Sequence, residues 1–286
     1  GLHDAAHNVA AHLDAEIGDV DKTLESSKFV FEGTYSTPFV QMASIEPHIS
    51  LTWLDENNRL VIRTSTQVPF HVRRIVAEVM GIPVSKIHVI KPRLGGGFGG
   101  KQEILNEELV AAVTLKTGRP ARIEYTRAEE LFAARLRHPE LVSFRLGFDE
   151  NQMLTAIDLN ILENCGAYGP HALTVMSVTA QKALSMYKAP SIRVNGDGVY
   201  TNLPIGGAYR GYGAPQAFFP LESLMDEAAE TMGIDPIELR LKNVFKVGDD
   251  IPIAKILGEG REGFPMVLYS TEIEACLEEG RILSDW

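Results

Sequence analysis

The sequence predicts an α+β fold in which mixed and antiparallel sheets pack against helices. Two runs of β-branched and aromatic residues, 49–54 and 60–64, flank a polar Asp-Glu-Asn-Asn turn, which is typical of a hairpin. Residues 69–80 follow with apolar side chains at helical spacing. Hairpins that recur among helices favour α+β layers over one doubly wound parallel sheet.

The other expected elements follow the same signals in chain order. Strands are expected at 29–35, 87–90, 121–125, 141–148, 153–163 and 192–201. Helices are expected at 103–116, 172–187, 215–232 and 271–283, with a short one that starts at Asp235-Pro236. Gly118 is suited to end the helix at 103–116, because glycine tolerates the left-handed conformation of a helix C-terminus. Asp235 and Pro236 are typical of an N-cap and a first helical position.

The chain is expected to divide into three parts. Residues 1–28 are polar and rich in alanine, and we interpret them as a lead-in segment that wraps another part of a larger protein. Residues 29–150 form a first α+β subdomain with a glycine-rich loop. Residues 151–286 form a second α+β subdomain with an Ala-Tyr-Arg-Gly-Tyr-Gly motif.

Composition narrows the class of protein. The 286 residues carry a net charge of −11, which disfavours nucleic acid and anionic lipid as partners, because both are bound by basic surfaces. No apolar run approaches the roughly 18 residues of a membrane span, and the N-terminus does not resemble a signal peptide. We therefore expect a cytoplasmic protein in which Cys165 and Cys276 are reduced thiols. Two cysteines are too few for an iron–sulfur cluster.

The first unusual segment is the loop Gly95–Lys101, with five glycines and one lysine among seven residues. It matches the dinucleotide-binding pattern of glycines, with Glu124 as an acidic ribose ligand, but a hairpin precedes it. It also matches the start of a phosphate-binding P-loop, except that Gln102 stands where magnesium requires Ser or Thr. A strand, a glycine loop and a helix N-terminus in series would still favour an anion.

The second unusual segment is Ala208–Gln216, in which Arg210 lies between two tyrosines and several glycines, just before a helix. Together with Thr66-Gln67 and Gly95–Lys101, this segment resembles the molybdenum-subunit motifs of the xanthine dehydrogenase/aldehyde oxidase family. The resemblance runs from about Glu32 onward. Smaller matches are Glu46-Pro47-His48, Arg137-His138-Pro139, Gly166-Ala167-Tyr168 and Lys242-Asn243.

The resemblance implies a molybdopterin-binding domain of xanthine dehydrogenase type, of which this chain would be the N-terminal part. Such enzymes use a pterin–dithiolene molybdenum cofactor, in some members as the cytosine dinucleotide form. They hydroxylate a purine-like N-heterocycle or an aldehyde with water as the oxygen source. Electrons leave through iron–sulfur clusters to FAD on partner chains or domains.

The resemblance also assigns cofactor contacts. Gln67 would hydrogen-bond an oxo ligand of the metal, and Gly97, Phe98 and Gly99 would present backbone N–H groups to the cofactor. Arg210 would lie near the metal and cofactor as a fixed cation. An anionic, oxo-rich group favours such donors. No side chain of this chain is expected to bind molybdenum directly.

Substrate contacts are implied at Tyr212, which would stack on the substrate ring, and at Gln102. Animal xanthine-oxidising members carry Glu at the place of Gln102 and a purine-orienting Arg at the place of Val178. Both departures weigh against xanthine itself as the substrate.

The family's catalytic base is a Glu in a Gly-Glu motif, which is expected beyond Trp286. The chain alone is therefore expected to be inactive and to need the C-terminal half of the molybdenum subunit. We interpret Glu259 as a solvated loop residue, and His138 and His171 as ordinary structural histidines. Two alternatives stay open: a nucleotide-binding enzyme that uses the Gly95–Gly100 loop, and a non-catalytic assembly domain.

Overall fold

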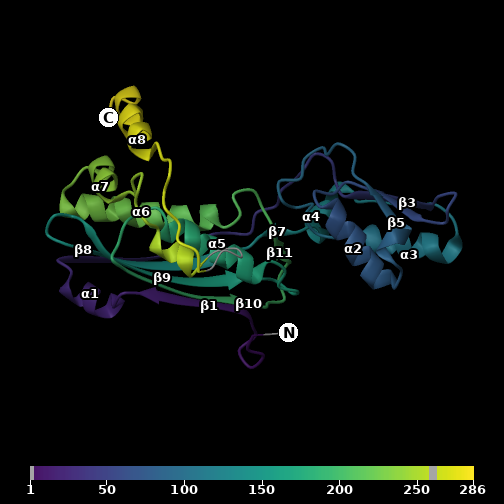
Figure 1. Cartoon of the computed structure of the whole chain (residues 1–286), viewed down its shortest axis with the longest axis horizontal. Helices are drawn as coiled ribbons and strands as arrows, with labels where there is room; N and C mark the ends of the chain where they lie inside the picture. Colours follow the sequence, from purple (N-terminus) through teal and green to yellow (C-terminus); the bar gives the residue numbers. More distant parts are fainter. Residues whose placement is uncertain (1–2, 258–262) are drawn as a thin grey trace. The chain divides into compact units, whose positions relative to one another are not determined.

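The computed structural model describes residues 3–257 and 263–286, which form two compact units (Figure 1). Unit 1 consists of Gly1–Pro38, His138–Thr201 and Gly211–Trp286, and unit 2 consists of Phe39–Arg137 and Asn202–Arg210. Each unit combines a sheet with helices, so the predicted α+β class is confirmed.

Unit 1 is built on a five-stranded sheet with the order β1-β10-β9-β8-β2. The strands are β1 (Val9–Ile17), β2 (Phe29–Ser36), β8 (Glu140–Phe148), β9 (Leu154–Asn164) and β10 (Ser191–Val199). Only the β9–β10 pair is parallel, and the other three pairs are antiparallel. The sheet is therefore mixed, as the sequence predicts.

Helices cover both faces of this sheet (Figure 1). Helices α5 (Ala172–Leu184) and α6 (Ala214–Met232) pack on one face and bury Ile157 and other apolar residues of the main core. Helix α1 (Val20–Ser26) packs Val20 and Leu24 on Ala156. Because successive side chains of a strand point to opposite faces, α1 covers the other face. The unit also contains α7 (Pro236–Asn243), the short helix η2 (Pro252–Lys255) and α8 (Ile273–Leu283).

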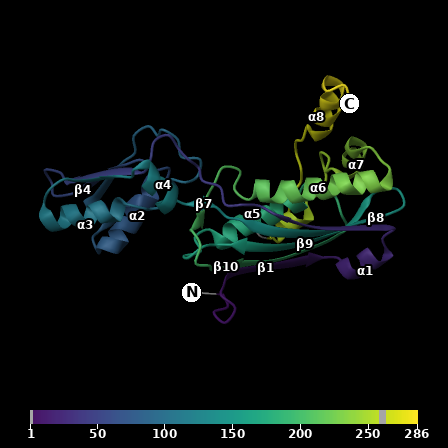
Figure 2. The same ribbon diagram turned by 180° about the vertical axis from the view of Figure 1, so that it is seen from behind.

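Unit 2 contains a four-stranded sheet with the order β5-β4-β3-β6. The strands are β3 (Ile49–Leu54), β4 (Leu60–Thr64), β5 (Ile87–Ile90) and β6 (Ala121–Glu124). Helices α2 (Pro69–Met80) and α3 (Glu107–Thr117) bury Val76 and Ala111 with Leu60 and Ile62 of β4. Figure 2 shows helices α2 and α3 beside strand β4 of this sheet. The remaining elements are η1 (Val84–Lys86), α4 (Arg127–Ala133) and the two-stranded sheet of β7 (Leu136–Arg137) and β11 (Gly206–Gly207).

Local signals explain several element ends. Helix α2 has the predicted bounds, with Pro69 in its first turn and Gly81 in the left-handed conformation at its end. Gly118 ends α3 in the same way, at φ +69°. The Asp235 side chain accepts hydrogen bonds from the N–H groups of Ile237 and Glu238, so the predicted N-cap of α7 is confirmed.

Two expectations about organisation differ from the structure. Residues 9–17, expected within a lead-in segment, pair with β10 along the edge of the unit 1 sheet. The expected division after residue 150 falls in the turn between β8 and β9, which pair along their length within one unit. Neighbouring antiparallel strands need only a short connection, and a polar turn there does not separate subdomains.

Candidate functional site

The Gly95–Lys101 loop of unit 2 folds back on itself after β5. Gly96, Phe98 and Gly99 all have positive φ, at +104°, +50° and +100°. A Cβ on Gly99 would lie 2.6 Å from the carbonyl oxygen of Ala208. The Arg210 N–H donates to the carbonyl of Phe98 over 2.7 Å. The two unusual segments of the sequence therefore lie directly against each other, and Gly99 permits the close approach.

Gln67 fills the inner side of this loop. Its Oε1 accepts hydrogen bonds from the N–H groups of Gly99 at 3.0 Å and Lys101 at 3.3 Å. A Cβ on Gly97 would lie 2.5 Å from the same oxygen, so a larger residue there would displace the Gln67 side chain. These contacts fix which amide atom faces the loop. The Gln67 Nε2 group has no hydrogen-bond partner among the described residues and is left as a donor.

Sequence reasoning missed the residues that hold the ends of the loop. The Glu46 carboxylate accepts from the Gly95 N–H at 2.5 Å and from the Lys101 Nζ at 3.3 Å. Lys101 is 1% exposed, and its Nζ also donates to the Glu46 carbonyl and to Ser65 Oγ, each over 2.8 Å. Burial lowers the pKa of Lys101 despite the charge of Glu46. Lys101 is thus a structural anchor of the loop rather than a ligand-facing cation.

A second anchor is a buried ion pair. His48 Nδ1 lies 2.9 Å from the Glu130 carboxylate, and His48 Nε2 lies 3.2 Å from the Gly100 carbonyl. Burial alone would raise the pKa of Glu130, but the hydrogen bonds and charge of His48 outweigh it and lower that pKa. Among these anchors, Glu46 and His48 belong to the Glu46-Pro47-His48 match and Lys101 belongs to the glycine-loop motif, but neither match predicts the anchoring contacts.

Arg210 is exposed at the outer side of the same segment. Its carbonyl accepts from Arg137 Nη2 over 2.6 Å, and the Arg137 guanidinium lies 4.1 Å from the centre of the Tyr209 ring. The backbone of this segment is therefore held by Arg137. Within the described part of the chain, the Arg210 guanidinium has no ion-pair partner, so its charge is available to an anion.

The residues predicted to contact substrate fall in different units. Gln102 belongs to unit 2, where its N–H donates to the Gly99 carbonyl over 3.1 Å. Tyr212 belongs to unit 1, where its hydroxyl lies 2.7 Å from His171 Nδ1 and 2.6 Å from Thr174 Oγ1. Val178 is buried in α5. Five predicted residues, Gln67, Gly97, Phe98, Gly99 and Arg210, thus come together in unit 2.

One expectation about the loop is wrong. The sequence suggested that the glycine loop runs directly into a helix N-terminus, but α3 begins at Glu107, beyond residues 102–106. Its first turn carries Glu107 and Glu108, which disfavour an anion at that helix end. The donors that fit an anionic, oxygen-rich group are instead the Gln67 amide and the Arg210 guanidinium. These residues therefore fit the cofactor that the family resemblance implies.

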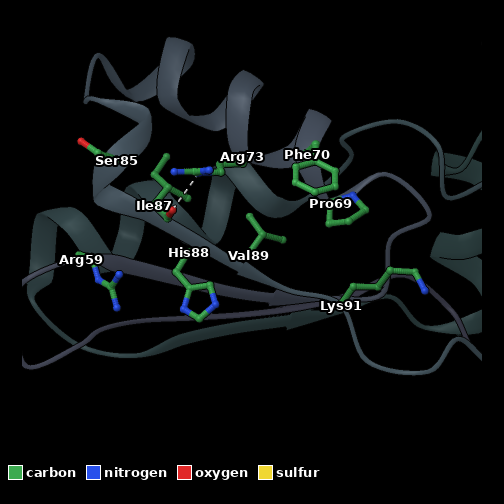
Figure 3. Close-up of a pocket in the computed structure, with 9 residues that line it drawn as sticks. All are labelled: Arg59, Pro69, Phe70, Arg73, Ser85, Ile87, His88, Val89 and Lys91. Atoms are coloured by element: carbon green, nitrogen blue, oxygen red, sulfur yellow. Dashed lines mark hydrogen bonds between the residues drawn. The ribbon is translucent and has the colours of Figure 1, made fainter.

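A separate cavity of about 380 Å³ lies between α2 and β5 (Figure 3). Figure 3 shows Arg73 of α2 directed at the Ile87 carbonyl, to which its Nε donates over 3.1 Å. The lining residues are Arg59, Pro69, Phe70, Arg73, Ser85, Ile87, His88, Val89 and Lys91. None of the predicted site residues lines this cavity.

No helix in residues 3–257 and 263–286 is both long and apolar enough to cross a membrane. Glu259, which we interpreted as a solvated loop residue, lies outside the described residues.

Comparisons with known proteins identify the family of this chain. The family model of the molybdopterin cofactor-binding domain matches residues 2–244. The xanthine dehydrogenase molybdenum-binding subunit of Escherichia coli O157:H7 is 37% identical over 270 residues, which cover 94% of this chain and 35% of that protein. The nicotinate dehydrogenase large molybdopterin subunit of Eubacterium barkeri is 33% identical over 242 residues, which cover 85% and 57%.

A solved structure extends the comparison to the fold. The aldehyde oxidoreductase from Desulfovibrio gigas superposes with a TM-score of 0.87 at 27% identity, and the match covers 97% of this chain and 30% of that one. This chain thus spans between 30% and 57% of the length of these three proteins. On the family model and the matching fold, the chain belongs to the molybdopterin cofactor-binding domain family.

Proposed function

We propose that this chain is the cofactor-holding part of a molybdenum hydroxylase subunit that oxidises a purine-like N-heterocycle or an aldehyde. The observation that carries the proposal is the Gln67 amide, whose oxygen is fixed by two backbone N–H groups of the glycine loop. Because the amide oxygen of Gln67 is held by these two contacts, the amide nitrogen is left as one oriented donor. An oriented donor suits an oxygen ligand of a metal cofactor.

In this proposal each residue has a separate task. Gln67 Nε2 would donate to an oxo ligand and Arg210 would balance the negative charge of the cofactor. The N–H groups of Gly97 and Phe98 would face the cofactor, whereas the expected contact from Gly99 does not fit, because its N–H donates to Gln67. The bound molybdenum–pterin group, in its plain or its cytosine dinucleotide form, supplies oxidation of the substrate carbon with oxygen from water. Tyr212 would stack on the substrate ring and Gln102 would contact the substrate.

The remaining catalytic tasks would belong to polypeptide outside this chain. A Glu outside this chain would act as the base, supplied by the C-terminal half of the molybdenum subunit. Iron–sulfur and FAD subunits or domains would accept the electrons. Relatives named for xanthine, nicotinate and aldehyde support the substrate class, and Gln102 and Val178 argue against xanthine as the preferred heterocycle.

The nucleotide-binding alternative has no support in the geometry. A phosphate loop needs its backbone N–H groups free for the ligand. Here the N–H groups of Gly95, Gly99 and Lys101 donate to Glu46 and Gln67. No observation favours a non-catalytic assembly domain.

The first test is Gln67→Glu in the complete enzyme, with Gln67→Ala beside it. Glutamate keeps an oxygen for the Gly99 and Lys101 N–H groups but removes the amide donor. Loss of one oriented donor costs about 10²–10³ in kcat. We therefore expect a kcat reduced by that factor in Gln67→Glu, at an unchanged melting temperature. A wild-type kcat in both variants would exclude Gln67 from the site.

The second test is Arg210→Ala, with the exposed Arg119→Ala as the matched control. Because no carboxylate of the described residues forms an ion pair with Arg210, its removal should leave the melting temperature unchanged. We expect a kcat at least tenfold lower and a reduced molybdenum content, whereas Arg119→Ala should resemble the wild type. A complete wild-type enzyme that retains no molybdenum would contradict the proposed function itself.

A further inference from the structure

Unit 1 contains a fully buried group of potential metal ligands that is unrelated to the glycine loop. His138 follows β7, Glu163 is in β9, and Cys165 comes just after β9. All three side chains are 0% exposed. One ligand atom from each residue lies within 4.8 Å of the other two. Imidazole, carboxylate and thiolate are together the donor set of a zinc ion.

The distances within this group suit one small cation. His138 Nδ1 and Cys165 Sγ each lie 3.4 Å from the same oxygen, Glu163 Oε1. Tetrahedral zinc with bonds of about 2.0 Å to N and O and about 2.3 Å to S places such ligand pairs about 3.3–3.5 Å apart. The carbonyl of Asn164, 3.2 Å from His138 Nδ1, is an oxygen from which a fourth ligand could come.

Polar atoms left without partners concentrate at the same place. Glu163 Oε2 and His138 Nε2 are buried and have no hydrogen-bond partner in the described part of the chain. Each such atom destabilises the fold unless something satisfies it, and buried polar atoms of this kind call for an ion or a water. The Glu163 carboxyl also lies beside that of Glu140, its register partner across the β8–β9 ladder. Two adjacent carboxylates need a proton or a cation between them.

We propose that His138, Glu163 and Cys165 hold a structural zinc ion. Binding would release the Cys165 thiol proton and the proton of the Glu163 carboxyl to solvent, and both groups would become anionic ligands of Zn²⁺. The site is closed on all sides, which is typical of structural rather than catalytic zinc. It would fix the end of β9, from which the chain runs through residues 166–171 to the His171 that holds Tyr212. The inference does not depend on the proposed function.

A cluster without metal is the competing state. Burial raises the pKa of both Glu163 and Cys165 and lowers the pKa of His138 to about 4. All three groups would then be neutral, and no divalent ion would be bound.

Metal analysis of the complete, purified protein distinguishes the two states. Zinc and molybdenum are measured separately by mass spectrometry after exhaustive dialysis against a weak chelator. We expect about one zinc per chain in the wild type and at least a tenfold loss in Cys165→Ser and in Glu163→Gln. The exposed Cys276→Ser is the matched control and should keep its zinc. Because molybdenum is counted separately, a failure here leaves the proposed function untouched.

Cobalt substitution tests the ligands in the wild-type protein, independently of whether the variants fold. Protein produced with Co²⁺ should show a thiolate-to-cobalt charge-transfer band in the near ultraviolet, which Cys276→Ser retains. Wild-type protein that is folded yet holds less than a tenth of an equivalent of any divalent metal would overturn the proposal. So would zinc that persists unchanged in both folded Cys165→Ser and Glu163→Gln.

Discussion

At the scale of single residues, the site depends on how closely backbone and side chain can approach. Gly97 and Gly99 each lack a side chain that would meet a neighbouring group, and the neighbouring group differs between them. Gly97 makes room for the Gln67 amide, and Gly99 makes room for the Ala208 carbonyl. The glycine density of the loop therefore serves contacts within the protein that orient Gln67 and the segment of Arg210. It does not in itself indicate a phosphate site.

Gly99→Ala is expected to destabilise the protein more than Gly118→Ala. Both glycines have positive φ, but a Cβ at Gly118 meets nothing within 4 Å, whereas at Gly99 it meets backbone at 2.6 Å. The extra overpacking should lower the free energy of unfolding by about 1–3 kcal/mol beyond the Gly118 variant. Denaturant titration of the complete protein measures the difference. Equal losses would mean that the Ala208–Arg210 segment does not lie against the loop.

At the scale of elements, the glycine loop is held by residues from three segments of unit 2. Glu46 and His48 precede β3, Ser65 and Gln67 link β4 to α2, and Glu130 lies in α4. Two of the anchoring groups are carboxylates whose pKa is lowered. For Glu46, hydrogen bonds from Ser65 and Gly95 and the charge of Lys101 outweigh the opposing effect of burial. The loop should therefore be sensitive to acid.

We predict that the stability contributed by Glu130 is lost at low pH. A carboxyl whose folded pKa lies below its ordinary value of 4.5 stabilises the fold fully above that value. This stability is lost as the pH falls from about 4.5 through the folded pKa. Removing one partner of a buried ion pair costs about 3–5 kcal/mol, so Glu130→Gln should lose that much at pH 6.

Glu130→Gln should also show a shallower decline in the free energy of unfolding between about pH 5 and pH 3, because it lacks the carboxyl that takes up a proton in this range. Urea titrations across this range measure the slope, with the exposed Glu150→Gln as the control. If Glu130→Gln and wild type declined in parallel, the His48–Glu130 pair would not be ionic in the folded protein.

How far the sequence predicts these elements depends on the signal each one carries. Helix α2 and the β3–β4 hairpin follow from spacing and turn chemistry alone. Strand β1 alternates Ala11, Leu13 and Ala15 with polar residues, but its acidic residues masked that alternation. Helix α4 carries a capping box from Thr126 to Glu129, a readable signal that was missed. The two-residue strands β7 and β11 have no sequence signal, because tertiary pairing alone creates them.

The residues of the candidate site also differ in how far the sequence predicts them. Gln67, the glycine loop and Arg210 were found through motif resemblance, and the structure brings them together in unit 2. The roles of Glu46, His48 and Lys101 could not be predicted, because a buried Lys or His is identified only by its partners. The same holds for His138: periodicity cannot show that it meets Glu163 and Cys165.

At the scale of the whole molecule, each unit has its own apolar core. Leu159 belongs to the core of unit 1, and Ile62 belongs to the core of unit 2. Both side chains are 0% exposed. Because the chain crosses between the units through a few short connections, the two cores should respond separately to substitution.

Ile62→Ala and Leu159→Ala should therefore raise hydrogen exchange in different segments of the complete protein. Each truncation costs about 2–5 kcal/mol of local stability, so amide protection should fall by at least tenfold within the affected unit. In Ile62→Ala the change is expected in β3, β4 and α2, and in Leu159→Ala it is expected in β8, β9 and β10. The exposed Val79→Ala in α2 serves as the control. Equal loss of protection in both units after either truncation would show that they unfold as one cooperative body.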